Sequence, residues 1–424
     1  MSDPRKMYSA VREEPFPEEM SLRLGDQELR FKKRLWNIDG KKRGLRYGEN
    51  PDQPAALYEL TAGRLELGGA LFRGPGQGLV AALKENDLIQ AGKHPGKINL
   101  TDVDNGLNIL QYLAERPAAV ILKHNNPCGA AWDKNSPLRA LEKAYWSDRI
   151  AAFGGAVVLN RPVDKACAEF LASSYFEVLA APEYEQGAVE LLKNRKNLRI
   201  MRIPGLAELE RLAAAPFLDI KSLLDGGLIL QFSFQNRLRS PEDFIAAKAE
   251  KDGQIITARA PSRSEAEDLI FAWAVEAGVT SNSVIFAKDG ATTAIGTGEQ
   301  DRVGCVELAI HKAHTKFSDR LAFQAKGLSL YELSAKADAE PALAEFLAEI
   351  EAQTKAERAG LPGSALVSDG FFPFRDGVDI ALAQGVTAIA QPGGSIRDFE
   401  IIEAVNQAAP QAAMVFTGQR AFNH

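Results

Sequence analysis

Short apolar segments alternate with helical patterns along most of the chain, and this alternation is the strongest constraint on its fold. Strands are expected at 118–122, 156–159, 178–181, 386–390 and 413–416. Helices are expected at 136–146, 165–173 and 264–277, and from residue 303. Strands that alternate with helices are typical of a predominantly parallel α/β sheet. A second α/β region is expected from about residue 223, and Asp289-Gly290 predicts a hairpin between 281–288 and 291–296.

Length and composition restrict the class of protein. A chain of 424 residues is expected to form two or three domains or lobes. A net charge of -6 without a long basic tract gives no indication of nucleic-acid binding. The three cysteines form no CxxC pair, so neither a disulfide framework nor a thiolate zinc site is indicated. With no signal-peptide pattern and no apolar run long enough for a membrane span, the sequence predicts a cytoplasmic protein without a membrane partner.

Two neighbouring titratable residues, Lys123 and His124, follow the apolar segment 118–122. In open parallel sheets, ligands bind at the carboxyl ends of the strands, where we expect this pair. A buried lysine loses proton affinity and an imidazole titrates near neutrality, so the pair is suited to moving a proton. For the dipeptide alone, an ordinary surface turn is the favoured interpretation.

Three other loops carry candidate ligand-binding residues. Arg46 and Tyr47 stand before a turn rich in glycine and proline, and an arginine there suits a phosphate or carboxylate. The glycine-rich turn at 296–298 leads to Arg302 at a helix start, a place suited to an anion. The aromatic cluster at 371–374 precedes Asp376, and together they are compatible with core packing or with a slot for a flat heteroaromatic ring.

Long aperiodic motifs occur in a characteristic order. They are LRYGENP (45–51), INLTD (98–102), LKHNNPCG (122–129), SDRIAAFGG (147–155), SNSVIFAKDG (281–290), SDGFFPFRDG (368–377), QPGGSIRD (391–398) and FTGQRAFNH (416–424). From about residue 45 to the end, the sequence resembles the AICAR transformylase half of the bifunctional purine-biosynthesis enzymes. Only about 40 residues precede the match, so the resemblance implies a stand-alone transformylase without the IMP cyclohydrolase domain.

The resemblance implies transfer of a formyl group from the co-substrate 10-formyltetrahydrofolate to the 5-amino group of AICAR. The amine is a poor nucleophile, so the reaction needs a base and a group that stabilises the tetrahedral oxyanion. By resemblance, His124 is the base, Lys123 tunes it or stabilises the intermediate, and Asn282 holds either the formyl oxygen or the amine. Further positions match the AICAR pocket, with the arginines on its phosphate: Arg46, Tyr47, Asn99, Gly154, Glu177, Phe371, Arg420 and His424. The folate side is implied at Phe153, Arg302, Pro373, Asp376 and Ser395.

The resemblance also implies a fold and an assembly. It predicts two cytidine-deaminase-like α/β lobes with mainly parallel sheets: residues 41–220 with about 318–360, and residues 221–317 with 361–424, after an N-terminal arm at 1–40. It predicts a homodimer with shared active sites. The zinc signature of deaminases is missing around Pro127-Cys128, so no metal is expected, while some relatives bind a monovalent cation.

Several positions depart from the usual family pattern, and other functions stay open. Asp52 stands where histidine is usual, and residues 296–302 differ around the glycine turn, which bears on the folate pocket. The alternatives are a nucleotide-binding protein without turnover, a chain that retains cyclohydrolase activity, and a hydrolase that uses water in place of the amine.

Overall fold

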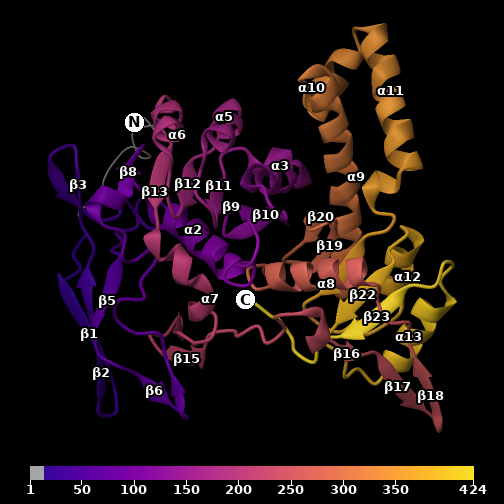
Figure 1. Ribbon diagram of the computed structural model, residues 1–424, viewed down its shortest axis with the longest axis horizontal. Helices are drawn as coiled ribbons and strands as arrows, with labels where there is room; N and C mark the ends of the chain where they lie inside the picture. Colours follow the sequence, from indigo (N-terminus) through magenta and orange to yellow (C-terminus); the bar gives the residue numbers. More distant parts are fainter. Residues whose placement is uncertain (1–13) are drawn as a thin grey trace. The chain divides into compact units, whose positions relative to one another are not determined.

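The computed structural model describes residues 14–424, which divide into two compact units (Figure 1). Unit 1 comprises the described residues up to Asn125, Asn135–Leu138 and Gly154–Gln235. Unit 2 comprises Asn126–Lys134, Arg139–Phe153 and Asn236–His424. These units differ from the predicted lobes, because residues 318–360 and the segments around 126–134 and 139–153 belong to unit 2. Among the helices of the described residues, none is long and apolar enough to cross a membrane.

The first part of unit 1 consists of small antiparallel sheets. The expected N-terminal arm lies partly outside the described residues, but residues from 19 onward form strands because alternate apolar side chains pack against Leu29, Leu65 and Phe72. One sheet has the order β1 (Glu19–Leu24), β2 (Gln27–Lys33), β5 (Tyr58–Ala62). The other pairs are β3 (Trp36–Ile38) with β4 (Lys41–Arg43), β6 (Glu66–Leu67) with β7 (Ala70–Leu71), and β14 (Leu218–Ser222) with β15 (Leu228–Phe232).

The main sheet of unit 1 contains the apolar segments that the sequence predicts as strands. Its order is β9 (Ala118–Lys123), β11 (Ala156–Leu159), β12 (Val178–Ala181), β13 (Arg199–Arg202), β8 (Leu88–Gln90). The helices of this unit are α2 (Lys97–Leu110), α5 (Lys165–Ser173), α6 (Gln186–Lys193) and α7 (Leu209–Leu212). Helix α2 packs closely on the sheet at Gly106, where a Cβ atom would lie 2.6 Å from Val158 Cγ2 and 2.9 Å from Leu122 Cδ1.

The strand directions in unit 1 change the expected position of Lys123 and His124. Strands β11, β12 and β13 are parallel, but β9 runs antiparallel to β11, with Leu122 opposite Ala156. The carboxyl end of β9 therefore lies beside the amino ends of the parallel strands. The expectation that the pair follows a parallel strand at its carboxyl edge is wrong, because β9 enters the sheet in the opposite direction.

The main strands of unit 2 also run in mixed directions. Their order is β16 (Ile245–Ala246), β23 (Ala413–Phe416), β22 (Ala388–Gln391), β21 (Ala365–Ser368), β19 (Val284–Lys288), β20 (Ala291–Gly296), β10 (Asn126–Trp132). Strands β21, β22 and β23 are parallel, and the remaining pairs are antiparallel. The predicted turn at Asp289-Gly290 is confirmed, with φ angles of 53° and 69° between β19 and β20.

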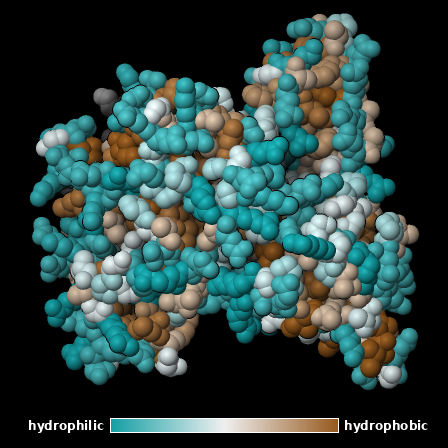
Figure 2. Space-filling model, viewed as in Figure 1, coloured by the Kyte–Doolittle hydropathy of each residue, from teal (hydrophilic) through white to brown (hydrophobic). Residues whose placement is uncertain are grey.

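The helices of unit 2 cover these strands and extend from them. They are α3 (Pro137–Ser147, whose first turn belongs to unit 1), α4 (Arg149–Ala152), α8 (Arg263–Glu276), α9 (Arg302–Lys326), α10 (Leu330–Ala337), α11 (Pro341–Ala356), α12 (Asp376–Ala383) and α13 (Asp398–Gln407), with a hairpin of β17 (Lys248–Lys251) and β18 (Gln254–Thr257). Helix α9 ends at Gly327, whose φ of 67° closes the helix. Figure 2 shows hydrophobic atoms between α10 and α11, where Leu333 and Ile350 form a small core with Ala322 of α9.

Both units combine three parallel central strands with antiparallel strands at their sides. The prediction of an α/β fold is thus confirmed in its general form. The mixture of directions explains why each unit presents functional candidates at a different end of its parallel strands. In unit 2, the loops after β21, β22 and β23 hold residues 369–376, 392–398 and 417–424, at the carboxyl ends as expected.

Candidate functional site

The Lys123-His124 step opens a two-residue turn with an uncommon backbone. His124 and Asn125 have φ angles of 56° and 59°, and positive φ at both central residues is typical of a type I′ turn. Helix α2 holds this turn from one side. The Oδ1 atom of Asp102 accepts a hydrogen bond from Asn125 N at 2.6 Å, and the Nδ2 atom of Asn105 donates to Asn125 O at 2.8 Å. The turn is thus held in a conformation that costs energy for non-glycine residues, a common feature of functional sites.

Gly154 provides space beside Lys123. A Cβ atom at Gly154 would lie 3.7 Å from Lys123 Nζ and 3.6 Å from the ring of Tyr175, and the φ of 74° also favours glycine. Gly154 N donates to Tyr175 O at 2.8 Å, which ties the start of β11 to the loop before β12. The structure therefore brings Lys123 and Gly154 together.

Asp102 is a buried carboxyl group next to the turn. Burial raises the pKa of Asp102, while the hydrogen bond from Asn125 and the positive charges of His124 and Lys123 oppose that rise. Asp102 lies within helix α2 and not at its start. Helix α2 begins earlier, after Gly96, whose N–H donates to Asn99 Oδ1 at 3.0 Å. Asn99 thus stabilises the start of α2, whereas Asp102 accepts a hydrogen bond from the His124-Asn125 turn.

Arg46 and Tyr47 lie together in a loop of unit 1. The Arg46 Nη2 atom donates to Tyr47 Oη at 2.7 Å, and the guanidinium carbon is 4.5 Å from the centre of the tyrosine ring. Nη1 of the same arginine donates to Lys93 O at 2.9 Å. Arg46 is only 9% exposed, so its charge is largely withdrawn from water.

A second buried arginine, Arg199, converges on the same carbonyl. Its Nη2 atom donates to Lys93 O at 3.4 Å, and its Nη1 atom lies 3.4 Å from Glu177 Oε2. Burial lowers the pKa of Arg199, the charge of Glu177 raises it, and the like charge of Arg46 lowers it. Two guanidinium groups therefore share one partner carbonyl, with the half-exposed Glu177 as the neighbouring carboxylate.

The loop before α2 adds a buried histidine to this cluster. His94 Nε2 lies 2.6 Å from Gly44 O, and burial lowers the pKa of this imidazole, with nearby arginines acting in the same direction. Among the described residues, Arg46 Nε, Arg199 Nε and His94 Nδ1 are buried without a hydrogen-bond partner. Buried positive charge needs an opposite charge to be stable. The cluster of Arg46, Tyr47, His94, Glu177 and Arg199, which we name the arginine cluster, is thus suited to a nearby anion.

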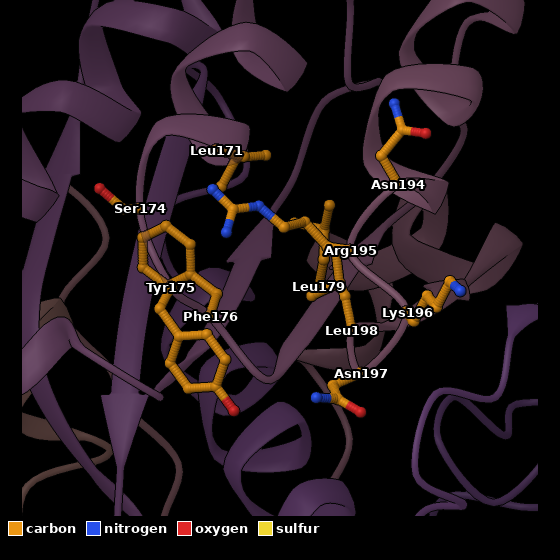
Figure 3. A pocket seen from close by; sticks show the side chains of 10 residues that line it. All are labelled: Leu171, Ser174, Tyr175, Phe176, Leu179, Asn194, Arg195, Lys196, Asn197 and Leu198. Atoms are coloured by element: carbon orange, nitrogen blue, oxygen red, sulfur yellow. The ribbon is translucent and has the colours of Figure 1, made fainter.

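A small cavity near this cluster has a different character. Figure 3 shows its lining, which combines apolar side chains such as Leu171, Phe176, Leu179 and Leu198 with polar ones such as Ser174 and Asn197. Its volume is about 280 Å³. Tyr175 also lines the cavity, and its Oη atom lies 3.4 Å from Glu177 Oε1. The cavity therefore adjoins the arginine cluster through Tyr175, and its own lining includes the cationic side chains Arg195 and Lys196.

In unit 2, Asn282 lies in a polar network before β19. Its Oδ1 atom accepts from Arg302 Nη2 at 2.9 Å, and its Nδ2 atom donates to Gln300 O at 3.1 Å. Arg302 Nη1 donates to Ser283 O at 3.0 Å and forms an ion pair with Asp369. The structure thus brings the predicted residues Asn282 and Arg302 into direct contact.

The C-terminal tail joins this network. Ser281 N donates to Asn423 O at 2.9 Å, and Ala421 N donates to Asp369 O at 3.0 Å. The tail side chains stack in sequence: the Arg420 guanidinium is 5.6 Å from the Phe422 ring, which is 5.9 Å from the His424 ring. A Cβ atom at Gly370 would lie 2.7 Å from the Phe422 ring, so Phe422 covers the residue before Phe371. Phe371, Arg420 and His424 are therefore carried by neighbouring segments of unit 2.

The residues expected on the folate side lie on three loops of unit 2. Phe372 N donates to Gln391 Oε1 at 2.7 Å, Gln391 Nε2 donates to Asp398 Oδ1 at 3.1 Å, and Ser395 N donates to Asp398 Oδ2 at 3.1 Å. This chain of hydrogen bonds ties the loop of Pro373 and Asp376 to the loop of Ser395.

The folate-side candidates differ in exposure. Pro373 and Asp376 are exposed, and Phe153, on another segment, is 62% exposed. Arg302 differs from them because it is only 8% exposed.

A buried carboxyl group, Glu276, supports the network behind Asn282. It is the last residue of α8, is fully buried, and accepts a hydrogen bond from Ser283 Oγ. Burial raises the pKa of Glu276 well above its ordinary value, and the negative charge of Asp369 adds to the effect. The folded protein therefore retains a proton here that the unfolded chain releases above its ordinary pKa.

Because the folded state keeps the proton of Glu276, the free energy of unfolding should depend on pH. Between the ordinary pKa of a glutamate and the raised pKa of Glu276, the folded state binds more protons, so the free energy of unfolding falls as pH rises. The contribution is about 1.4 kcal/mol per pH unit. Glu276→Gln should flatten this dependence in urea unfolding between pH 5 and 8, whereas the exposed control Glu307→Gln should follow the wild type. Parallel curves for Glu276→Gln and wild type would contradict the prediction.

Several residues of these networks were not identified from the sequence. Arg199, Asp369 and Glu276 occupy strands or helix ends that read as ordinary core or turn. The available signal was a charged residue at the boundary of an apolar segment, as in Arg199-Ile200-Met201. Within residues 14–424, no group of three or more His, Cys, Asp or Glu side chains is arranged to hold a metal ion.

Comparison with known proteins identifies the family. The family described as "AICARFT/IMPCHase bienzyme" matches residues 17–312. The chain is similar to the bifunctional purine biosynthesis protein PurH of Magnetococcus marinus, with 36% identity over 389 residues, covering 91% of this chain and 60% of that protein. It is also similar to PurH of Myxococcus xanthus, with 34% identity over 421 residues, covering 98% of this chain and 64% of that protein. The chain thus spans about three fifths of the length of the curated relatives it matches. With well over half of its length matched, the chain belongs to the AICARFT/IMPCHase bienzyme family.

Proposed function

We propose that this chain transfers the formyl group of 10-formyltetrahydrofolate to the 5-amino group of AICAR, giving FAICAR and tetrahydrofolate in purine biosynthesis. The observation that carries the proposal is the arginine cluster in the same unit as the Lys123-His124 turn. The cluster suits the phosphate of a nucleotide, and the turn presents a base and a cation. The names of the relatives, bifunctional purine biosynthesis proteins, support the pathway.

The reaction assigns a task to each catalytic group. The amine nitrogen of AICAR attacks the formyl carbon, a carbon–nitrogen bond forms, and the carbonyl electron pair moves onto oxygen. His124 accepts the proton that the amine loses, Lys123 tunes His124 or stabilises the oxyanion, and Asn282 holds either the formyl oxygen or the amine. When the intermediate collapses, the bond from the formyl carbon to N10 of the folate breaks. N10 takes up a proton, which leaves FAICAR and tetrahydrofolate.

The remaining residues bind the two substrates. Arg46 binds the AICAR phosphate together with Arg420, and Arg199 adds its charge behind Arg46. The rest of the nucleotide pocket consists of Tyr47, Asn99, Gly154, Glu177, Phe371 and His424. The folate pocket consists of Phe153, Pro373, Asp376 and Ser395, where apolar surfaces and one carboxylate suit a pterin.

The proposal includes the form in which the enzyme acts. Two cytidine-deaminase-like lobes form a cytoplasmic homodimer whose subunits share the active sites. The chemistry requires only proton transfer and oxyanion stabilisation, so no metal is required. We propose that the chain acts as a transformylase and has no IMP cyclohydrolase activity.

A formyl-transfer assay tests this function directly. Purified protein supplied with AICAR and 10-formyltetrahydrofolate should produce FAICAR and tetrahydrofolate in equal amounts, because one formyl group moves in each turnover. Without AICAR, no formate should be released. Binding of AICAR without product would favour a nucleotide-binding protein, and formate release without AICAR would favour a hydrolase. Either result overturns the proposal.

The same preparation tests the restriction to one activity. FAICAR supplied alone should not be converted to IMP, whereas a full-length bifunctional relative serves as the positive control. Formation of IMP at a rate comparable to that control would show that the restriction is wrong, while leaving the formyl-transfer proposal intact.

A further inference from the structure

Asn282 could either donate a hydrogen bond to the formyl oxygen or accept one from the AICAR amine. The contact of Asn282 with Arg302 bears on which of these two roles it has. A side-chain amide either donates through its nitrogen or accepts through its oxygen. An arginine carries only N–H donors, so the atom of Asn282 that faces Arg302 Nη2 at 2.9 Å must be the oxygen. The atom that faces the carbonyl oxygen of Gln300 at 3.1 Å must be the nitrogen. Both ends of the amide are therefore assigned by their partners.

Arg302 is itself held firmly. It is 8% exposed, and its Nη1 atom contacts Ser283 O at 3.0 Å and the fully buried Asp369. Asp369 also accepts from Ser281 Oγ at 2.6 Å. A Cβ atom at Gly370 would come within 2.6 Å of Arg302 Nη2, so the backbone of Gly370 closes the space on the other side of the guanidinium. The group cannot turn toward a ligand without breaking these contacts.

We infer that Arg302 is a positioning residue that fixes the Asn282 amide with its nitrogen toward the substrates, so that Asn282 donates to the formyl oxygen. This inference rests on the proposed formyl transfer. The nitrogen carries two N–H groups, and the contact with Gln300 uses one of them. The second N–H is the donor for the oxyanion that forms when the amine attacks. The Asn282 oxygen already accepts from Arg302, so the alternative role, in which it accepts from the AICAR amine, would have to use its one remaining lone pair beside the guanidinium.

This role differs from the folate-binding role expected for Arg302. A folate ligand would contribute to binding of 10-formyltetrahydrofolate, and its loss would raise the KM for that substrate. A positioning residue acts on the transition state through Asn282, and its loss lowers kcat. Steady-state kinetics therefore separates the two roles.

The central experiment is a double-mutant cycle with Arg302→Lys and Asn282→Ala. A lysine retains a charge for Asp369, but its single nitrogen does not reproduce the two-pronged contact with Asp369 and Asn282. Arg302→Lys should lower kcat about tenfold and leave both KM values within about twofold. In the Asn282→Ala background, the same change should have almost no further effect, because the group through which it acts is gone. The control is Arg263→Lys, an arginine whose side chain is 94% exposed, which should not alter activity.

Asn282→Asp provides a second test that does not disturb the buried ion pair. A carboxylate still accepts from Arg302, but it has no N–H to donate. Asn282→Asp should therefore lose about 10²- to 10³-fold in kcat, as does the removal of an oxyanion donor in other enzymes. Near-normal kcat in this variant would overturn the donor assignment.

The remaining outcomes are equally decisive. Equal losses from Arg302→Lys in both backgrounds, or a raised KM for 10-formyltetrahydrofolate at constant kcat, would overturn the positioning role. A crystal structure of Arg302→Lys separates this inference from the reaction itself. If the Asn282 amide keeps the same orientation there, the positioning role is wrong whether or not the wild type transfers formyl groups. If the wild type shows no transfer but the amide turns, the proposed function and the donor role toward the formyl oxygen fail, while the positioning of the Asn282 amide by Arg302 stands.

Discussion

Replacing His124 with asparagine should lower kcat for formyl transfer about 10³-fold and leave the KM for AICAR within about twofold. Loss of a general base costs about 10²- to 10⁴-fold in rate. The AICAR amine is delocalised into its ring and cannot attack while it keeps its proton. Because the phosphate of AICAR is assigned to the arginine cluster, binding should survive the substitution. Steady-state rates of tetrahydrofolate formation measure both constants.

The choice of asparagine follows from the backbone of the turn. His124 has a φ of 56°, a conformation that asparagine adopts more readily than most residues. Alanine at this position would add a backbone penalty of about 1 kcal/mol and mix a folding defect with the catalytic one. Thermal unfolding should therefore show His124→Asn close to the wild type. His311→Asn, an exposed histidine on α9, is the matched control. Retention of kcat within about tenfold in His124→Asn would rule out the base.

Local sequence patterns predicted the elements of this fold well. Strands β11, β12 and β23 have the residues expected for them, and the capped helix predicted at 264–277 is α8. These segments are short, apolar and bounded by turn residues, so their own residues determine their structure. The direction of β9 was not predictable in this way. A strand is equally apolar in a parallel or an antiparallel position, and the sheet order is decided by contacts between distant residues.

The residues of the candidate site also divide into those that local sequence predicts and those that depend on distant contacts. Residues in long motifs, such as Lys123, Gly154 and Asn282, were identified because their neighbours in sequence carry the pattern. Arg199 and Asp369 were missed because their importance depends on partners far away in the chain: Lys93 for Arg199, and Arg302 for Asp369. Arg302 itself was assigned to the folate side by resemblance, while its place beside a glycine-rich turn suggested only an anion. Only its burial and its contact with Asn282 indicate another role.

Replacing Arg46 with glutamine should raise the KM for AICAR about 100-fold while kcat at saturation changes little. A hydrogen bond between charged groups contributes about 1.5 to 3 kcal/mol, and 2.7 kcal/mol corresponds to about 100-fold in affinity. Arg46 and Arg199 both donate to Lys93 O, so the two like charges are held close together. A phosphate near Arg46 relieves their repulsion, and this relief should make the wild type strongly prefer AICAR over its riboside, which lacks the phosphate.

The riboside makes the experiment specific to the phosphate. Arg46→Gln should lose most of the preference for AICAR, because the variant lacks the guanidinium that contacts the AICAR phosphate, and the riboside has no phosphate whose contact could be lost. The KM for the riboside should stay within about threefold of the wild-type value. Arg195→Gln, an exposed arginine four residues before Arg199, controls for a general loss of positive charge and should keep the full preference. If Arg46→Gln raised the KM values for AICAR and for the riboside by the same factor, Arg46 would stabilise the loop and would not bind the phosphate. The positive charge of the arginine cluster would then serve folding alone.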